Sequence, residues 1–145
     1  MEIVNRKANY NYFIEETYEA GIVLTGTEIK SIRVGKASIG DSYAVIRNNE
    51  CYLLNMHISA YKEGSINNVD ENRTRKLLFH VKEINKLQSK TDLGGYTLVP
   101  LKLYFKGNKA KILIGVGKGK KIYDKRETEK KKDTLREIQK NIKNK

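Results

Sequence analysis

Three of the four residues in the run Arg73-Thr74-Arg75-Lys76 are cationic. Arg73, Arg75 and Lys76 are therefore candidate contacts to nucleic-acid phosphates. Leu77 and Leu78 follow, and they cannot point the same way, because neighbours diverge by about 100° on a helix and about 180° on a strand. We expect one of the two to be exposed, where it could pack against a nucleotide. The alternative is a purely structural role for the whole segment.

A second run, Gly115-Val116-Gly117-Lys118-Gly119-Lys120-Lys121, combines three glycines with three lysines. It is not a Walker loop, which needs four residues between its glycines and then Lys followed by Ser or Thr. It also fails as a dinucleotide fingerprint, because Lys120 occupies the third glycine position. We interpret the run as a flexible strand exit whose charge suits a clamp on an RNA backbone.

No metal or cofactor site is expected, because His57, His80 and Cys51 do not have the spacing of a zinc motif. Cys51 is the only cysteine, which indicates a reducing compartment, and its place in a predicted strand indicates a small buried hydrophobe. Glu28-Ile29-Lys30 resembles the Glu-x-Lys of a metal-dependent nuclease, but no Pro-Asp precedes it. The start of a helix is the plainer interpretation. A small RNA nuclease or modifying enzyme that uses Glu28 or His80 remains the alternative from another class.

The last 28 residues, 118–145, hold 12 Lys or Arg against 5 Asp or Glu, so they carry +7 of the net charge of +12. They have too few apolar side chains to offset the entropy of ordering them. Their apolar stripe, Leu135, Ile138 and Ile142, is three residues wide. We predict a basic tail that is disordered when free and helical when bound to an anionic surface, of which nucleic acid is the commonest.

The remaining residues, 1–117, carry +5 and fit one domain. Because Met1 to Asn11 holds no apolar run and no stretch approaches 18 apolar residues, we expect no signal peptide and a cytoplasmic protein.

The pattern of the body predicts mainly strands. Apolar runs indicate strands over 18–24, 42–47 and 50–56, the last two joined by Asn48-Asn49 as a tight hairpin turn. Thr25 or Thr27 could cap a short helix that carries Ile29 and Ile32. Residues 63–72 are polar and predict a long loop.

A helix is expected over 80–88, with Val81, Ile84 and Leu87 facing inward and Gly94-Gly95 ending the connection. In the last hairpin, Gly107-Asn108 forms the turn and Pro100 should lie at an edge or a bulge. Leu101, Leu103 and Phe105 are predicted to share one face, Lys102, Tyr104 and Lys106 the other, and Ile112, Ile114 and Val116 to continue the apolar alternation. About six short strands with small helices favour a small antiparallel barrel of the OB type, a fold that hosts many oligonucleotide binders.

Several segments resemble the SsrA-binding protein (small protein B) family, in order and with matching spacing over essentially the whole chain. They are Asn5-Arg6-Lys7-Ala8, Tyr12 to Glu16, Glu19 to Leu24, Thr25 to Ser31, Gly35-Lys36-Ala37, Asp41-Ser42-Tyr43, Arg73 to Leu78, Gly95-Tyr96-Thr97, Gly117 to Lys121 and Asp124-Lys125-Arg126. Three positions depart from the family pattern: Thr27 stands where Trp is common, residues 69–72 replace a His-Asp-Pro run, and Tyr123 stands where some relatives have His.

The resemblance implies a non-enzymatic adaptor that binds transfer-messenger RNA and enters stalled ribosomes for trans-translation. The implied partners are that RNA, the small-subunit rRNA at the decoding centre and mRNA channel, and elongation factor Tu indirectly through the RNA; we expect a monomer. The surface for the tRNA-like part of the RNA would include Glu19, Leu78 and Lys111, and we add Asn5, Arg6 and Lys7 as RNA-binding candidates. Candidate ribosome contacts in the tail are Gly119, Lys120, Lys121, Tyr123, Asp124, Lys125, Arg126, Leu135, Ile138 and Ile142. A ribosomal structural protein with a basic extension is the remaining alternative.

Overall fold

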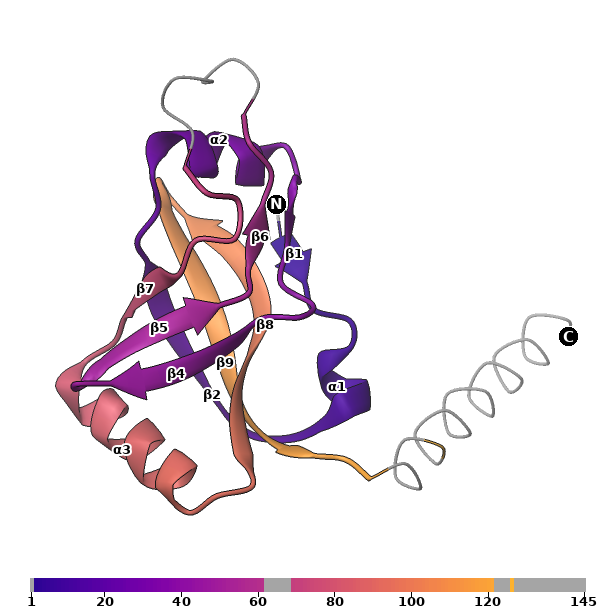
Figure 1. Ribbon diagram of the computed structural model, residues 1–145, viewed down its shortest axis with the longest axis vertical. Helices are drawn as coiled ribbons and strands as arrows, with labels where there is room; N and C mark the ends of the chain where they lie inside the picture. Colours follow the sequence, from indigo (N-terminus) through magenta and orange to yellow (C-terminus); the bar gives the residue numbers. More distant parts are fainter. Residues whose placement is uncertain (1, 62–68, 122–125, 127–145) are drawn as a thin grey trace, which may run out of the picture.

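The computed structural model describes residues 2–61, 69–121 and 126, which form an antiparallel β barrel with three helices around it (Figure 1). In chain order the elements are β1 (Glu2–Val4), α1 (Ala8–Asn11), β2 (Tyr12–Ile22), α2 (Gly26–Arg33), β3 (Ala37–Ser38), β4 (Tyr43–Arg47), β5 (Glu50–Leu54), β6 (His57–Ile58), β7 (Arg75–Leu78), α3 (Val81–Asp92), β8 (Tyr96–Lys106) and β9 (Lys109–Gly119). The mainly β class predicted from the sequence is confirmed. The predicted boundary at residue 117 stays a prediction, and β9 continues to Gly119.

The barrel closes through one additional strand pairing. The main sheet has the order β1-β8-β4-β5-β7-β2-β9, and β8 also pairs with β9, so the strands from β8 to β9 form a ring. β1 lies outside this ring as an edge strand on β8, and β3 and β6 form a separate small ladder. The interior is filled by aliphatic side chains such as Leu53, Leu77, Leu98, Ile112 and Ile114, all almost fully buried. β2, β7 and β9, which carry Glu19, Leu78 and Lys111, are thus held on a packed core.

Both predicted hairpin turns are confirmed. Asn48 and Asn49 have φ angles of 52° and 62°, the left-handed conformation that a two-residue turn between β4 and β5 requires. Gly107 has a φ of 59° at the turn between β8 and β9. Asparagine and glycine tolerate this conformation better than other residues, which is why the turns could be predicted from local sequence alone.

Pro100 lies at a bulge, as predicted, and the bulge changes which residues face the core. The register of β8 against β9 shifts between Pro100 and Lys102. Leu98 and Pro100 therefore lie opposite Val116 and Ile114, whereas Leu103 lies opposite Ile112.

The prediction that Leu101 shares a face with Leu103 is wrong. The methyl groups of Leu101 lie near Gly115, where a Cβ would be 3.1 Å from one of them, and Gly115 faces away from its core-facing neighbours Ile114 and Val116. The alternation expected from the sequence does not account for the extra residue of the bulge.

α2 begins as predicted. The Thr25 hydroxyl accepts from the Glu28 amide at 3.3 Å and the Glu28 carboxylate accepts from the Thr25 amide at 2.9 Å, a reciprocal capping box. Ile32 is buried on the inner side of α2, and Ile29 is partly buried. α2 covers one end of the barrel in Figure 1.

α3 extends over Val81–Asp92 and is longer than predicted. Ile84 and Leu87 face the core, but Val81 is 73% exposed, so its expected inward position is wrong. Residues spaced three apart are rotated by about 300° around the helix at each step, so three of them do not fit on one narrow face. Val81, at one end of this series, therefore lies outside the buried face.

β2 is also longer than the predicted strand over 18–24: it begins at Tyr12 and ends at Ile22. Of the polar segment predicted as a loop, residues 63–72, the part 63–68 lies outside the described residues. Among the residues that the structure describes, no helix has the length and apolar character that a membrane crossing needs.

Candidate nucleic-acid interface

Three of the predicted RNA-binding residues meet on one face of the barrel. Gly21 of β2 pairs with Leu78 of β7 on one side and with Lys111 of β9 on the other. Lys111 in turn pairs with Tyr104 of β8, so Leu78, Gly21, Lys111 and Tyr104 form a row across four strands. Glu19 lies two residues from Gly21 and shares its face. We call this surface the Leu78 face.

Leu78 is the exposed member of the leucine pair, as one of the two had to be. Its side chain is 54% exposed, whereas that of Leu77 is 1% exposed in the core. A Cβ on Gly21 would lie 3.4 Å from the Leu78 Cβ, so the absence of a side chain at Gly21 leaves a depression in the surface beside Leu78. A groove of about 560 Å³ lies here, with Leu78, Gly21, His80 and Lys111 among its lining residues.

Glu19 is held by two neighbours on β8. Its carboxylate accepts from the Tyr104 hydroxyl and from Lys106 Nζ, the latter at 3.0 Å. The hydrogen bond from Tyr104, followed by that from Lys106, lowers the pKa of Glu19. Burial and then the same hydrogen bond raise the pKa of Tyr104 to about 12. Glu19 therefore stays ionised and orients a cation and a phenol on the Leu78 face.

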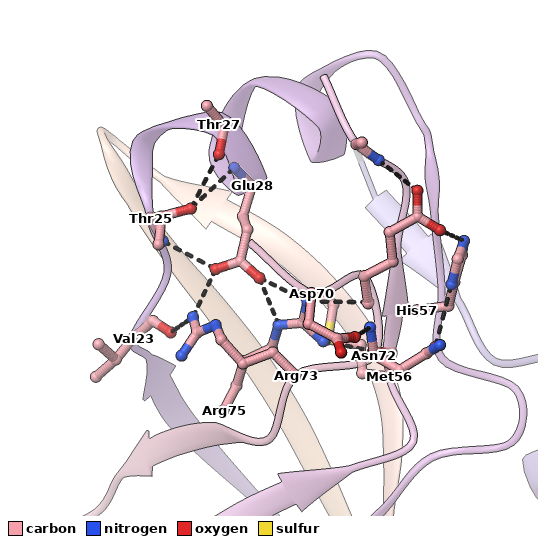
Figure 2. A network of polar contacts seen from close by, with 12 residues as sticks. Val23, Thr25, Thr27, Glu28, Met56, His57, Asp70, Asn72, Arg73 and Arg75 are labelled. Atoms are coloured by element: carbon pink, nitrogen blue, oxygen red, sulfur yellow. Dashed lines mark hydrogen bonds and ion pairs between the residues drawn. The ribbon is translucent and has the colours of Figure 1, made fainter. Parts of the chain in front are cut away.

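Arg73 and Arg75 of the arginine-rich segment both contact Glu28 (Figure 2), but they differ in burial. Arg75 is completely buried; its guanidinium donates to Glu28 Oε2 at 2.7 Å, to the Met56 carbonyl at 2.5 Å and to the Glu71 carbonyl at 3.1 Å. The prediction that Arg75 contacts RNA phosphates is therefore wrong, because no phosphate can reach it. Charge alone does not reveal whether an arginine is buried.

Arg73 pairs with the same carboxylate from the outside. Its Nη2 lies 2.6 Å from Glu28 Oε1, and its side chain is 32% exposed. Burial alone would raise the pKa of Glu28. The hydrogen bonds from Arg73, the Thr25 amide and Arg75 lower it by more than burial raises it, so the pKa of Glu28 lies below its usual value of 4.5. Glu28 is thus a structural counter-ion, and its place at the start of α2 agrees with the plainer interpretation of the sequence.

Lys76 lies on the surface but is already engaged. Its Nζ lies 2.9 Å from Glu50 Oε1, and Glu50 also accepts from the Tyr52 hydroxyl. The hydrogen bond to Glu50 raises the pKa of Lys76. A phosphate would therefore compete with Glu50 for this lysine, which makes it a weaker RNA contact than the sequence suggested.

The N-terminal candidates also differ from one another. Arg6 and Lys7 are exposed, whereas Asn5 is 7% exposed and its Nδ2 donates to the Pro100 carbonyl at 2.9 Å. Asn5 Oδ1 accepts from the Lys7 amide at 3.2 Å. The prediction that Asn5 binds RNA stays a prediction: both of its polar groups hold backbone, so its effect on a ligand would pass mainly through the position of Lys7.

The described start of the tail is fixed to α1. The Lys120 amide donates to the Asn11 carbonyl at 2.8 Å, its Nζ donates to the Asn9 carbonyl at 2.7 Å, and the ammonium lies 4.7 Å from the centre of the Phe13 ring. Gly119, Lys121 and Arg126 are exposed. The other tail candidates, Tyr123, Asp124, Lys125, Leu135, Ile138 and Ile142, lie outside the described residues.

Sequence reasoning missed Gly21, Tyr104 and Lys106 as parts of the Leu78 face. The alternation of Lys102, Tyr104 and Lys106 along β8 was the available signal, because it predicts that these side chains share an outer face.

Thr27, where the resembling family often has Trp, is buried at the start of α2, and its hydroxyl lies 3.2 Å from the Thr25 hydroxyl. Within the described ranges, no three His, Cys, Asp or Glu residues are grouped as metal ligands would be.

A closed antiparallel barrel with an aromatic and cationic outer face defines a small β-barrel protein of the nucleic-acid-binding class. The family model described as SmpB protein matches residues 2–144, and the chain belongs to this family. The SmpB family is one of adaptors and not of enzymes, so the enzyme alternative is discarded.

Curated relatives match over nearly the whole chain. The chain is similar to the SsrA-binding protein of Bacillus subtilis (strain 168), with 62% identity over 135 residues that cover 93% of this chain and 86% of the relative. The SsrA-binding protein of Acetivibrio thermocellus is 58% identical over 139 residues, which cover 96% of this chain and 90% of that protein. A solved structure described as "tmRNA-SmpB: a journey to the center of the bacterial ribosome" contains a chain with a TM-score of 0.71 and 48% identity; the match covers 83% of this chain and 85% of that one.

Proposed function

We propose that this protein binds transfer-messenger RNA and brings it to stalled ribosomes for trans-translation. The curated relatives are SsrA-binding proteins, and the similar solved structure is described as tmRNA-SmpB in the bacterial ribosome. The observation within the chain that carries the proposal is the Leu78 face, where strand pairing brings Glu19, Leu78 and Lys111 together from separate parts of the sequence.

The Leu78 face suits a folded RNA that is bound by shape. Leu78 and the Tyr104 ring offer apolar and aromatic area, Lys111 offers a cation for a phosphate, and Glu19 keeps Lys106 and Tyr104 in position. Folded RNA is recognised mostly through shape, sugar and phosphate contacts, and such a mixed surface supplies all three. We therefore assign the tRNA-like part of the RNA to this face.

The tail, residues 118–145, would occupy the mRNA channel when mRNA is missing. Its charge of +7 suits a channel walled by rRNA, and Tyr123 would stack on a decoding-site base while Asp124-Lys125-Arg126 set the path. A channel that already holds mRNA would exclude the tail sterically and electrostatically. Selectivity for stalled ribosomes would then need no sequence readout.

Further partners follow from this role. Elongation factor Tu would be engaged indirectly through the RNA, the protein would act as a monomer, and its place of work would be the cytoplasm, where ribosomes translate. A ribosomal structural protein with a basic extension is the competing function. Equal amounts of the protein on translating and on stalled ribosomes would favour that competitor, and enrichment on stalled ribosomes would favour the adaptor.

The test separates the barrel from the tail. A truncated chain that ends at residue 121 keeps the described anchor of Lys120 and removes most of the tail charge. It should bind transfer-messenger RNA with high affinity at moderate salt, while rescue of ribosomes stalled on a truncated mRNA fails. The matched control is the full chain with Lys111→Ala, which should lose RNA affinity. Loss of RNA binding in the truncated chain would contradict this division of roles.

A further inference from the structure

A second hollow lies at the opposite end of β2 from the Leu78 face. It has a volume of about 290 Å³ and lies between the segment Asn5–Tyr12 and the turn Gly40–Tyr43. Tyr12 lines this hollow and Gly21, nine positions further along β2, lines the Leu78 groove, which corresponds to at most about 30 Å along the strand at roughly 3.3 Å per residue. A single small ligand could therefore not contact both the hollow and the Leu78 face.

Two buried polar residues fix the walls of this hollow. Asn5 donates from its backbone to the Leu101 carbonyl at 2.8 Å and from its amide side chain to the Pro100 carbonyl at 2.9 Å. Ser42, which is 5% exposed, donates its hydroxyl to the Ile39 carbonyl at 2.7 Å. Both walls are thus held by hydrogen bonds to backbone, and the hollow has a defined shape without a ligand.

Five other side chains around the hollow have polar groups that the fold does not use. Within residues 2–61, 69–121 and 126, none of these side chains makes a hydrogen bond or ion pair with another residue. They are Lys7, Asn11, Tyr12, Asp41 and Tyr43. Elsewhere on the barrel the surface carboxylates Glu19, Glu50 and Glu71 all have partners, so this concentration of unused groups marks a place for a ligand.

We propose that this hollow binds a single unpaired nucleobase of RNA, with a preference for guanine. Its volume is at the low end of small-molecule pockets, about 300–1,000 Å³, which suits one base and not a larger ligand. Tyr12 and Tyr43 offer ring faces, on which unpaired RNA bases stack. Lys7 supplies a cation for the flanking phosphate. Asp41 accepts hydrogen bonds only, and guanine is the base with two adjacent donors on its pairing edge.

The base belongs to ribosomal RNA, and this assignment rests on the proposed function. Asn11 lines the hollow, and its carbonyl also accepts from Lys120 at the start of the tail. A tail that enters the ribosome therefore brings the hollow to the ribosomal side of the protein. The Leu78 face, at most about 30 Å away along β2, would hold transfer-messenger RNA at the same time.

Photo-crosslinking tests the identity of the ligand. A photoreactive benzoylphenylalanine replaces Tyr43 in the full chain, which is assembled with transfer-messenger RNA on stalled ribosomes, and the crosslinked nucleotide is located by reverse transcription. A crosslink to a guanine in ribosomal RNA is the expected result. A crosslink to transfer-messenger RNA would overturn the assignment to the ribosome. A crosslink to protein alone, or none, would overturn the nucleobase site.

Three variants test the chemistry of the site. Tyr43→Ala should weaken ribosome binding of the protein–RNA complex by roughly 5- to 100-fold, which is the usual effect of losing one base stack. Tyr43→Phe should keep most of the affinity, because it keeps the ring. Asp41→Asn should reduce the preference for guanine, measured by the shift of Tyr12 and Asn11 NMR signals on titration with GMP and AMP.

Arg47→Ala, at the other end of the same strand as Tyr43, is the matched control and should behave as wild type. Equal ribosome affinity for Tyr43→Ala and wild type would overturn the site. Failure of this proposal can be told from failure of the proposed function, because all of these variants should still bind isolated transfer-messenger RNA. A wild-type chain that does not bind that RNA would instead overturn the proposed function.

Discussion

Arg75→Ala provides the sharpest contrast between a structural arginine and an RNA-binding lysine. The substitution removes a guanidinium that is fully buried and hydrogen-bonded to Glu28, the Met56 carbonyl and the Glu71 carbonyl. The Glu28 side chain, which is 4% exposed, would keep only Arg73 as a cationic partner among these contacts. The variant should therefore be strongly destabilised.

The expected cost follows from the burial. Breaking one partner out of a buried ion pair typically costs about 3–5 kcal/mol when the other charge is left uncompensated. Arg73 still pairs with Glu28 in this variant, so we expect the lower end of that range, about 3 kcal/mol. A domain of this size has a total stability of about 5–15 kcal/mol, so the loss is a large fraction of it. At roughly 2–8 °C per kcal/mol, the melting temperature should fall by at least about 6 °C.

Lys111→Ala is the matched control, because Lys111 lies on the Leu78 face and not in the core. Its unfolding free energy should change by less than about 0.5 kcal/mol, while the salt slope of RNA binding falls by about one. Urea unfolding and RNA titrations at several salt concentrations measure both quantities. At a temperature where Arg75→Ala is folded, its slope should equal that of wild type. A stable Arg75→Ala protein with a reduced slope would refute the reasoning, because it would place Arg75 in contact with phosphate.

The remaining predictions concern a non-ionic contact, the tail anchor, acid stability and the tail helix. Leu78→Ala should weaken RNA binding without changing the salt slope, because it removes apolar area and no charge; a lower slope would contradict this role. Lys120→Met should lower the hydrogen-exchange protection of its own amide and reduce rescue, and Lys120→Arg should restore both, because arginine can still donate to the Asn9 carbonyl. The lowered pKa of Glu28 means that its contribution to stability is complete above about pH 4.5 and is lost as the pH falls through the lower folded value; Glu28→Gln should remove this part of the acid dependence in thermal melts. Ile138→Pro, outside the described residues, should reduce rescue by blocking the tail helix while RNA binding is unchanged; full rescue would mean that the tail acts as an unstructured polycation.

The sequence predicted those features of the fold that depend on neighbouring residues. Alternating apolar side chains and the turn residues Asn48-Asn49 are local signals, and both hairpins formed as expected. The bulge after Pro100 was also indicated by the missing amide of proline. The effect of the bulge on Leu101 was not indicated by the sequence. The position of the extra residue depends on the register of β8 against β9, and the local pattern of β8 does not contain that information.

The candidate site was predictable where exposure follows from geometry. Either Leu77 or Leu78 had to face outward, and the structure exposes Leu78. The burial of Arg75 was not predictable, because its partner Glu28 lies 47 residues away in the sequence. The local pattern around Glu28 indicates only its position at the start of a helix, and nothing in it shows that two arginines converge on its carboxylate.

The pairing of charges on the barrel explains how the two parts of the protein can act differently. Lys76, Lys106, Arg73 and Arg75 each have a carboxylate partner, so part of the positive charge of residues 1–117 is neutralised within the fold. Because residues 1–117 carry a net charge of only +5, we expect the barrel to gain RNA affinity mainly through shape and non-ionic contacts, which lose little as salt rises. The tail holds 12 basic residues against 5 acidic ones, and the salt-dependent part of ribosome binding should therefore come mainly from it. Such a division lets the barrel hold its RNA continuously while the tail tests whether the channel is empty.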